Sequence, residues 1–252
     1  MSAPRSDGWA LFLDFDGTLV DIAERPEAVV VDPTLPPVLE RLQQQLAGAL
    51  AIVTGRPIAT IDDFLSPRRL DVAGLHGVEY RLAGTLHPCR PEEHPALRRA
   101  IERLRRRVAE MEGVLVEDKG CSVAVHWRLA PHAEAKVRDL MASMAAELGA
   151  DYRLQKGKAV IEVLPARAAK GAIIQHFLQH APYRGRRPIF VGDDLTDELG
   201  FEVVNGLGGM TFRIGHEPTC AKRRIATPGE LRRCLAAWAD QGAIDLAKIG
   251  TA

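Results

Sequence analysis

The chain of 252 residues has no excess of charge of either sign, because lysine plus arginine and aspartate plus glutamate both number 33. Its overall charge therefore gives no support for binding to nucleic acid or to a membrane surface. The longest apolar run, around residues 46–53, is too short to span a bilayer. Residues 1–8 contain no apolar segment typical of a signal peptide. We expect a cytoplasmic monomer without nucleic-acid or membrane partners.

Cysteine is sparse and irregularly spaced. The four cysteines are Cys89, Cys121, Cys220 and Cys234, and no two of them form a Cys-x-x-Cys pair. This spacing argues against a zinc site and gives no regular disulfide framework. Together with the absence of a signal peptide, it predicts four free thiols in a reducing compartment.

Apolar segments typical of buried strands alternate with segments of helical periodicity in the first third of the chain. The expected strands are residues 9–13, 50–53 and 70–73, and the expected helices are residues 35–46 and 58–65. The alternation returns late in the chain, with helices at 170–180, 197–204 and 229–238 and strands at 188–191 and 210–214. It predicts an α/β fold with a Rossmann-like parallel sheet between helices.

The order of elements changes in the middle of the chain. An apolar helical stripe at residues 97–111 precedes strands at 114–119 and 122–129, and a second stripe at 137–148 precedes strands at 152–156 and 159–164. The order αββαββ suits a small open α+β sheet with both helices on one side. We therefore predict a discontinuous catalytic core of residues 1–82 and 167–252, with an inserted domain of residues 83–166.

Polar residues follow the strands of the predicted core. Asp14 and Asp16 follow the first strand, Thr54 and Gly55 the second, and Asp193 and Asp194 the strand at 188–191, with Asp197 one turn later. Lys170 begins the helix that leads to that last strand. Because ligands gather outside the carboxyl ends of parallel strands, we expect these side chains to meet at one site.

Several carboxylates at one place require a cation. Hard oxygen ligands without histidine or cysteine favour Mg²⁺. A magnesium ion, a lysine and a hydroxyl group together suit a phosphoryl group, and a carboxylate can attack that group to form an aspartyl-phosphate. The sequence therefore predicts phosphoryl chemistry at this edge of the sheet.

Each of these motifs also has an ordinary structural interpretation. Thr54-Gly55 is compatible with a simple turn, and Lys170 with a solvated helix start. Asp193, Asp194 and Asp197 are compatible with an acidic helix cap. Their occurrence together, each at the end of a strand or the start of a helix, favours the catalytic interpretation.

Four motifs in this order resemble those of the haloacid-dehalogenase-like (HAD) superfamily of phosphotransferases. They are Asp14-x-Asp16-Gly-Thr, Thr54-Gly55-Arg56, Lys170, and Gly192-Asp193-x-x-x-Asp197. The resemblance implies that Asp14 is the nucleophile, that Asp16 is the general acid and base, and that Thr54 and Lys170 hold the phosphoryl group. It also implies that the inserted domain is a cap that closes over the site.

The same resemblance implies how Mg²⁺ is held. Its ligands would be the Asp14 carboxylate, the Asp16 carbonyl and Asp193, with Asp197 or Asp194 supporting through water. An aspartate at position 16 favours a phosphatase or mutase, because a carboxylate there can protonate the leaving oxygen and then activate water.

The strands expected in the inserted domain alternate apolar and polar residues. Val123, Val125, Trp127 and Leu129 share one face of their strand, and Ala124, His126 and Arg128 share the other. Glu117 points with Lys119, and Lys158 with Glu162. Such polar side chains suit a polyhydroxyl ligand, since sugar hydroxyls both donate and accept hydrogen bonds. An ordinary solvent-facing sheet would show a similar pattern.

Longer strings are similar to the trehalose-6-phosphate phosphatase family. They are Glu117-Asp118-Lys119, His126-Trp127-Arg128, Gly157-Lys158, Glu162-Val163-Leu164-Pro165, Gly74-Leu75-His76-Gly77-Val78-Glu79 and Gly192-Asp193-Asp194-Leu195-Thr196-Asp197-Glu198. The resemblance, from about residue 11 to residue 212, implies a Mg²⁺-dependent phosphatase that converts trehalose 6-phosphate to trehalose and inorganic phosphate in trehalose biosynthesis. It implies that the substrate-binding residues are Gly55, Arg56, His76, Lys119, His126, Arg128, Lys158 and Glu162.

Two alternatives stay open at this point. One is a related phosphatase that acts on sucrose 6-phosphate or mannosyl-3-phosphoglycerate. The other is a non-catalytic sugar-phosphate sensor on the same fold. A sensor is expected to have lost Asp14, Asp16 or Lys170, and all three are present.

Overall fold

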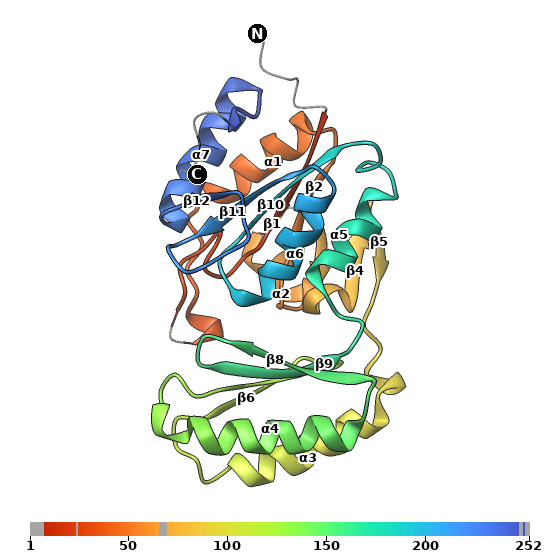
Figure 1. The fold of residues 1–252 in the computed structure, drawn as a ribbon, viewed down its shortest axis with the longest axis vertical. Coiled ribbons are helices and arrows are strands. Elements are labelled where there is room, and N and C mark those ends of the chain that lie inside the picture. Colours follow the sequence, from red (N-terminus) through yellow and green to blue (C-terminus); the bar gives the residue numbers. More distant parts are fainter. Residues whose placement is uncertain (1–7, 24, 66–69, 247–248, 250–252) are drawn as a thin grey trace. The chain divides into compact units, whose positions relative to one another are not determined.

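The computed structural model describes residues 8–23, 25–65, 70–246 and 249. The chain forms two compact units, which Figure 1 shows as ribbons. Unit 1 comprises Met1–Leu86 and Ala169–Ala252, and unit 2 comprises His87–Ala168. The sequence placed the corresponding borders after residues 82 and 166. The expectation that the first eight residues are not a signal peptide falls almost wholly on residues 1–7, which lie outside the described part.

Unit 1 is built on an eight-stranded sheet with the order β12-β11-β10-β1-β2-β3-β4-β5. Its strands are β1 (Trp9–Leu13), β2 (Leu50–Val53), β3 (Asp71–Gly74), β4 (Glu79–Leu82), β5 (Thr85–His87), β10 (Arg187–Gly192), β11 (Met210–Ile214) and β12 (Arg223–Ile225). Neighbouring strands from β12 to β3 are parallel, and β4 is antiparallel to β3. The α/β fold with a mainly parallel sheet is therefore confirmed.

Helices accompany the strands of unit 1. They are α1 (Leu35–Gln45), α2 (Ile58–Leu65), α5 (Lys170–Leu178), α6 (Leu195–Gly206) and α7 (Pro228–Gln241), with short 3-10 helices η2 (Pro26–Ala28) and η3 (Leu75–Gly77). Helix α1 packs against α7, and α5 packs against α6. All five residues of β1 are buried, as expected for a central parallel strand that is covered on both faces.

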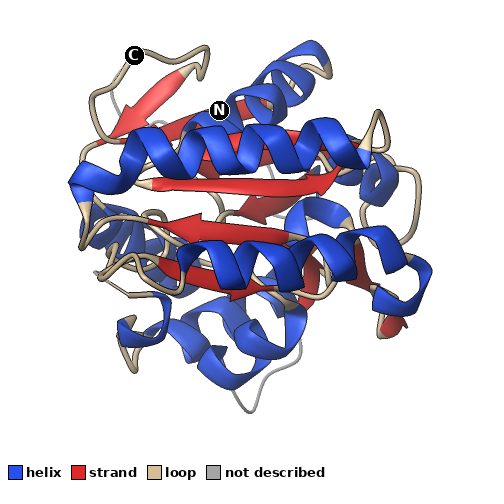
Figure 2. Cartoon of the chain, turned by 90° about the horizontal axis from the view of Figure 1, so that it is seen from below, coloured by secondary structure: helices blue, strands red, loops and turns tan. Residues whose placement is uncertain are grey.

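Unit 2 has the predicted order αββαββ. Its elements are α3 (Pro95–Val108), β6 (Leu115–Asp118), β7 (Val123–His126), α4 (Glu134–Leu148), β8 (Tyr152–Gly157) and β9 (Val160–Pro165), with η4 (Pro91–Glu93) and η5 (Pro131–Ala133). The strands pair antiparallel in the order β6-β7-β9-β8. Figures 1 and 2 show α3 and α4 along one face of this sheet.

The apolar stripes that predicted α3 and α4 form one core with the sheet. Leu97, Ile101 and Leu104 of α3 and Val137 and Met141 of α4 are buried in that core. They pack in the same cluster as the predicted apolar residues Val123, Val125 and Trp127. Leu129 was expected on the same face, but this prediction is wrong, because β7 ends at His126 and leaves Leu129 47% exposed in the following turn.

Three strands of unit 1 were not predicted. The segment of β4, Glu79-Tyr80-Arg81-Leu82, is half polar, and β12 begins with two arginines. Both β5 and β12 have only three residues. Short or half-polar strands at or next to the edges of a sheet carry too weak an apolar pattern to be recognised in a single sequence.

Two of the four cysteines are joined. Cys89, between β5 and η4, forms a disulfide with Cys121, in the turn between β6 and β7. The prediction of four free thiols is therefore wrong for this pair, whereas Cys220 and Cys234 are free. The two bonded residues are 32 positions apart, and only the fold of unit 2 brings them together. Among the described residues, no helix has the length and apolar character needed to cross a membrane.

Candidate functional site

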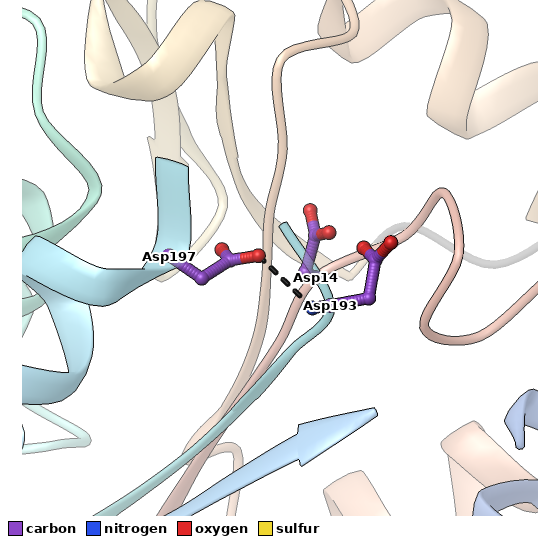
Figure 3. Close-up of side chains that lie close together, drawn as sticks. All are labelled: Asp14, Asp193 and Asp197. Carbon is purple, nitrogen blue, oxygen red and sulfur yellow. Dashed lines mark hydrogen bonds between the residues drawn. The ribbon is translucent and has the colours of Figure 1, made fainter. Parts of the chain in front are cut away.

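The pairing of β1 with β10 brings the two aspartate motifs together. Leu13 lies opposite Val191 in this parallel pair, and the Asp14 N–H donates to the Val191 carbonyl over 2.9 Å. Asp14 and Asp193, which directly follow the two strands, are therefore neighbours at the carboxyl edge of the sheet, as Figure 3 shows. Both side chains are buried, with 5% and 4% exposure. The predicted convergence of strand ends holds for this pair.

Lys170, the first residue of α5, supplies the buried cation. Its Nζ donates to Asp14 Oδ1 over 2.8 Å and to Asp197 Oδ1 over 2.7 Å. Burial alone would lower the pKa of Lys170, but the charges of Asp14 and Asp197 outweigh it and raise that pKa. The ammonium is therefore charged throughout the range in which proteins fold.

Asp197 is fixed from two sides. Its Oδ2 accepts from the N–H groups of Asp193 and Asp194 over 3.1 and 3.0 Å, while Oδ1 accepts from Lys170. These bonds hold the turn that enters α6. Because both Asp197 oxygens already have partners, this side chain orients the turn and Lys170 more directly than it offers a free ligand atom.

Burial sets the protonation behaviour of Asp14. Desolvation raises the pKa of Asp14 well above its usual range, Lys170 opposes this, and the charges of Asp197 and Asp193 add to it. A second positive charge beside Asp14 and Asp193 would relieve this repulsion. Asp14, Asp193 and Asp197 each place one ligand atom within 4.8 Å of the others. This oxygen-only set fits a hard divalent cation such as Mg²⁺.

Thr18 is a member of this site for which the sequence predicted no role. Its Oγ1 lies 3.5 Å from Asp14 Oδ2 and 3.4 Å from Asp193 Oδ1, and the side chain is fully buried. At Gly17, with φ of +73°, a Cβ would lie 2.2 Å from Asp193 Oδ2. Only glycine permits this close approach of the backbone to Asp193.

Asp16 and Arg56 form a two-bonded ion pair. Arg56 Nε donates to Asp16 Oδ2 and Arg56 Nη2 donates to Asp16 Oδ1, each over 2.7 Å. The guanidinium also donates to the Pro26 carbonyl over 3.0 Å, and it lies over the rings of Phe15 and Phe64. Arg56, predicted to bind substrate, therefore fixes the orientation of the Asp16 carboxylate, which points to Arg56 and not into the Asp14–Asp193–Asp197 group.

Thr54, Gly55 and His76 form a second loop cluster. The buried Thr54 hydroxyl accepts from the Arg56 N–H over 3.1 Å and can still donate its own hydrogen to an anion. His76 donates its N–H to the Thr54 carbonyl over 2.9 Å, and a Cβ at Gly55 would lie 2.7 Å from His76 Nε2. The sequence missed Glu79, whose Oε1 accepts from the Ile58 N–H at the start of α2 over 2.7 Å.

Unit 2 gathers charged side chains on the sheet face opposite its helices. Glu162, 6% exposed, accepts from Ser122 Oγ over 2.6 Å and from Lys119 Nζ over 3.1 Å. Glu117 Oε2 lies 2.9 Å from His126 Nε2 and 3.9 Å from Lys119 Nζ. We call these five residues the polar cluster of unit 2.

Electrostatics keep Glu117 of this polar cluster ionised. Burial would raise the pKa of Glu117, but its bond to His126 and the charge of Lys119 outweigh burial and lower that pKa. Ser122 was not predicted as a member, although its place next to the Lys119 turn gave a signal. The cluster therefore offers fixed donors and acceptors to a polyhydroxyl ligand.

Two predicted sugar contacts lie outside the strands. Arg128 follows the end of β7, and Lys158 lies in the turn between β8 and β9, where it is exposed. The prediction that Lys158 shares a strand face with Glu162 is therefore wrong, because β9 begins only at Val160. Arg128 Nη2 donates to the Lys158 carbonyl over 3.3 Å, which joins the end of β7 to the turn between β8 and β9.

Comparison with known proteins identifies relatives over nearly the whole chain. Residues 12–228 match the sequence profile of the family described as trehalose-phosphatase. A probable trehalose-phosphate phosphatase of Sinorhizobium fredii is 47% identical, over 83% of this chain and 78% of that protein. The trehalose-6-phosphate phosphatase of Escherichia coli is 40% identical, over 86% of this chain and 82% of that protein.

Solved structures give the same result for the fold. The structure of a trehalose-6-phosphate phosphatase related protein has a TM-score of 0.80 and 28% identity, and the match covers 92% of this chain and 98% of the other. A haloacid-dehalogenase-like hydrolase from Bacteroides thetaiotaomicron has a TM-score of 0.62 at 14% identity, covering 91% and 99% of the two chains. The fold is therefore of the HAD type.

Proposed function

Because this chain belongs to the trehalose-phosphatase family, we propose that it hydrolyses trehalose 6-phosphate to trehalose and inorganic phosphate. It is thus a phosphoric monoester hydrolase. The observation that carries the proposal is the buried Lys170 ammonium, bonded to Asp14 and Asp197 at the carboxyl edge of the sheet. A cation held beside a carboxylate nucleophile is what attack on a phosphoryl dianion requires.

The first step transfers the phosphoryl group to the protein. The Asp14 carboxylate attacks phosphorus, the bond from phosphorus to the sugar oxygen breaks, and Asp16 protonates that oxygen so that trehalose leaves. The Lys170 ammonium and the Thr54 hydroxyl bind the equatorial phosphoryl oxygens. Both Asp16 oxygens accept from Arg56 in the structure, so this ion pair has to open before Asp16 delivers its proton to the sugar oxygen.

The second step releases phosphate. Asp16, now ionised, takes a proton from water, and the resulting hydroxide attacks the phosphorus of the aspartyl-phosphate. The bond from phosphorus to the Asp14 oxygen breaks, which restores the carboxylate. Lys170 and Thr54 stay bonded to the leaving phosphate and stabilise its charge as it forms.

We propose that Asp14, Asp193 and the Asp16 carbonyl hold Mg²⁺, with Asp197 or Asp194 acting through water. The support is the buried oxygen-only group of Asp14, Asp193 and Asp197. When bound, Mg²⁺ neutralises phosphoryl oxygens and offsets the repulsion among the carboxylates.

We further propose that unit 1 is the catalytic core and that unit 2 is a cap that recognises the sugar. The polar cluster of unit 2 supplies paired donors and acceptors, as two joined glucose rings require. Glu162, which both Lys119 and Ser122 orient, is its central acceptor.

A panel of phosphate esters tests the substrate. We expect kcat/KM for trehalose 6-phosphate to exceed the values for sucrose 6-phosphate, mannosyl-3-phosphoglycerate and glucose 6-phosphate by about a hundredfold or more, because a polar site left with unpaired groups rejects an incomplete ligand strongly. Released phosphate is measured with Mg²⁺ present. Equal rates on all four esters would contradict the trehalose assignment, and binding without turnover would indicate a sensor.

Replacing Glu162 by glutamine tests the role of unit 2. The change keeps the shape of the side chain but removes its charge, so the loss of a charge-assisted hydrogen bond should raise KM for trehalose 6-phosphate by about 10- to 100-fold. Turnover of phenyl phosphate, which has no sugar, should stay within about twofold. Glu134→Gln, an exposed α4 glutamate paired with Arg138, is the matched control. A parallel loss on both substrates would refute sugar recognition by Glu162.

A further inference from the structure

Arg213 is a buried cation for which no role was predicted from the sequence. It lies in β11, opposite Gly192 of β10 in the parallel register, so it neighbours the residue that precedes Asp193. Its exposure is 3%. A charge in such a position is costly unless it is paired, so its partners indicate what it does.

The Arg213 guanidinium contacts the turn between β10 and α6 at two points. Arg213 Nη1 lies 3.3 Å from the Asp194 carbonyl and 2.7 Å from Glu198 Oε1. Its Nη2 donates to Glu217 Oε2 over 2.6 Å. The two contacts on Nη1 flank Asp197 along the chain, and Asp197 binds the N–H groups of Asp193 and Asp194.

Glu198 also binds a second segment of the chain. Its Oε2 accepts from the Cys220 N–H over 2.9 Å, so the carboxylate is held between Arg213 and the loop that follows β11. The turn is thus bonded by Asp197 on the side of the site and by Arg213 and Glu198 on the other side. Neither Arg213 nor Glu198 belongs to the carboxylate group of Asp14, Asp193 and Asp197.

The Arg213 side chain leaves one of its hydrogen-bond donors unsatisfied. Its Nε is buried and has no hydrogen-bond partner among the described residues. An unsatisfied buried donor costs about 1–3 kcal/mol. The side chain therefore gives up one hydrogen bond while both Nη atoms engage the turn and its flanking loop.

We propose that Arg213 is a positioning residue for the cation site. Acting through the Asp194 carbonyl and Glu198, it holds the turn of residues 193–198 so that the Asp193 carboxylate lies beside Asp14, where the two would bind a divalent cation. The inference rests on the proposed function, because it takes Asp14 and Asp193 as the ligands of Mg²⁺. Residues that do not bind the cation themselves, Arg213 and Glu198, would then influence its affinity.

Two substitutions of Arg213 test this assignment through Mg²⁺ binding. In Arg213→Met, we expect the affinity for Mg²⁺ alone, measured by calorimetry, to fall by about 10- to 100-fold, as is typical when residues that orient metal ligands are removed. Arg213→Lys keeps the charge and one bond and should recover part of this affinity. The Mg²⁺ concentration for half-maximal phosphate release should rise in parallel, while KM for the sugar phosphate at saturating Mg²⁺ should change less than twofold.

Arg81→Met is the matched control. Arg81 is also buried, at 7% exposure, and forms a two-bonded pair with Asp62 together with a bond to the Leu70 carbonyl. We expect it to lower thermal stability as much as Arg213→Met does but to leave Mg²⁺ affinity unchanged. If Arg213→Met does not fold, the comparison of Arg213→Lys with Arg81→Lys replaces it.

The outcomes separate the two proposals. Unchanged Mg²⁺ affinity in the Arg213 variants, an equal loss in the Arg81 variant, or no Mg²⁺ binding by the unchanged protein would each overturn the positioning role. Failure of the unchanged protein to release phosphate from trehalose 6-phosphate, with Mg²⁺ binding intact and sensitive to Arg213, would overturn only the proposed reaction.

Discussion

Replacing Asp14 by asparagine is expected to lower phosphate release from trehalose 6-phosphate by about 10⁴-fold or more, because the amide cannot form the covalent intermediate. The fold should survive the change. Asparagine has the same shape, its Oδ1 can still accept from Lys170, and burial of the Asp14 charge is itself unfavourable. Steady-state assays of released phosphate measure the loss of activity, and circular dichroism of the variant shows whether the fold is kept.

Two controls accompany Asp14→Asn. Asp21→Asn changes an exposed aspartate of the same segment, which pairs with Arg232, and should leave activity within about twofold. Asp16→Asn should keep the nucleophile but remove the acid and base, so phosphorylated protein should still form, slowly, and persist. Turnover retained by Asp14→Asn would show that another group attacks the phosphorus.

Replacing Lys170 by methionine is expected to reduce both activity and stability. Its removal leaves Asp14 and Asp197 buried without their cation, and breaking a buried ion pair costs about 3–5 kcal/mol of the free energy of unfolding. Loss of the charge that stabilises the transferring phosphoryl group should lower kcat by about 10²- to 10³-fold. Urea unfolding and phosphate release measure the two effects.

The stability loss in Lys170→Met should depend on pH in a defined direction. Burial already raises the pKa of Asp14 in the folded state, and the variant loses the opposing effect of Lys170. A carboxyl group whose folded pKa is raised favours folding most when it is protonated. The variant should therefore gain stability relative to the parent as the pH falls towards the ordinary pKa of an aspartate, and lose it as the pH rises.

A second substitution checks the cause of this loss. Asp14→Asn in the Lys170→Met background removes one of the unpaired charges and should restore part of the free energy of unfolding. Lys222→Met, which removes an amine that donates to the Gly209 carbonyl over 2.6 Å, is the matched control. No recovery in the double variant would mean that packing, and not charge, explains the effect of Lys170.

The core of this site was predictable because its residues stand next to strong local signals. Asp14 follows five consecutive buried residues, and Asp193 follows a second such strand. Parallel pairing then leaves little freedom in where the two acids meet. The position of Lys170 follows from the same logic. A helix that leads into a parallel strand begins near the carboxyl edge of the sheet, and Lys170 is the first residue of such a helix.

Residues whose role depends on distant partners were not predictable. Arg213 lies inside a strand, and no local sequence pattern indicates its contacts with Asp194 and Glu198. The Cys89–Cys121 disulfide has the same character, since spacing alone does not reveal that two loops meet. Polar alternation was informative for Glu162 but failed for Lys158, because it assumed a strand where the chain makes a turn.

The insertion of unit 2 into unit 1 sets the order in which the two units can fold during translation. Unit 2 is one continuous segment, His87–Ala168, so all its contacts exist once that segment has left the ribosome. Of the two partner strands of β1, β2 precedes unit 2 in the chain, whereas β10 is synthesised after all of unit 2. At about 5–20 residues per second, Asp14 waits on the order of ten seconds or more for Lys170 and Asp197 to emerge. A nascent chain therefore acquires its polar cluster first, and its phosphoryl chemistry only near the end of synthesis.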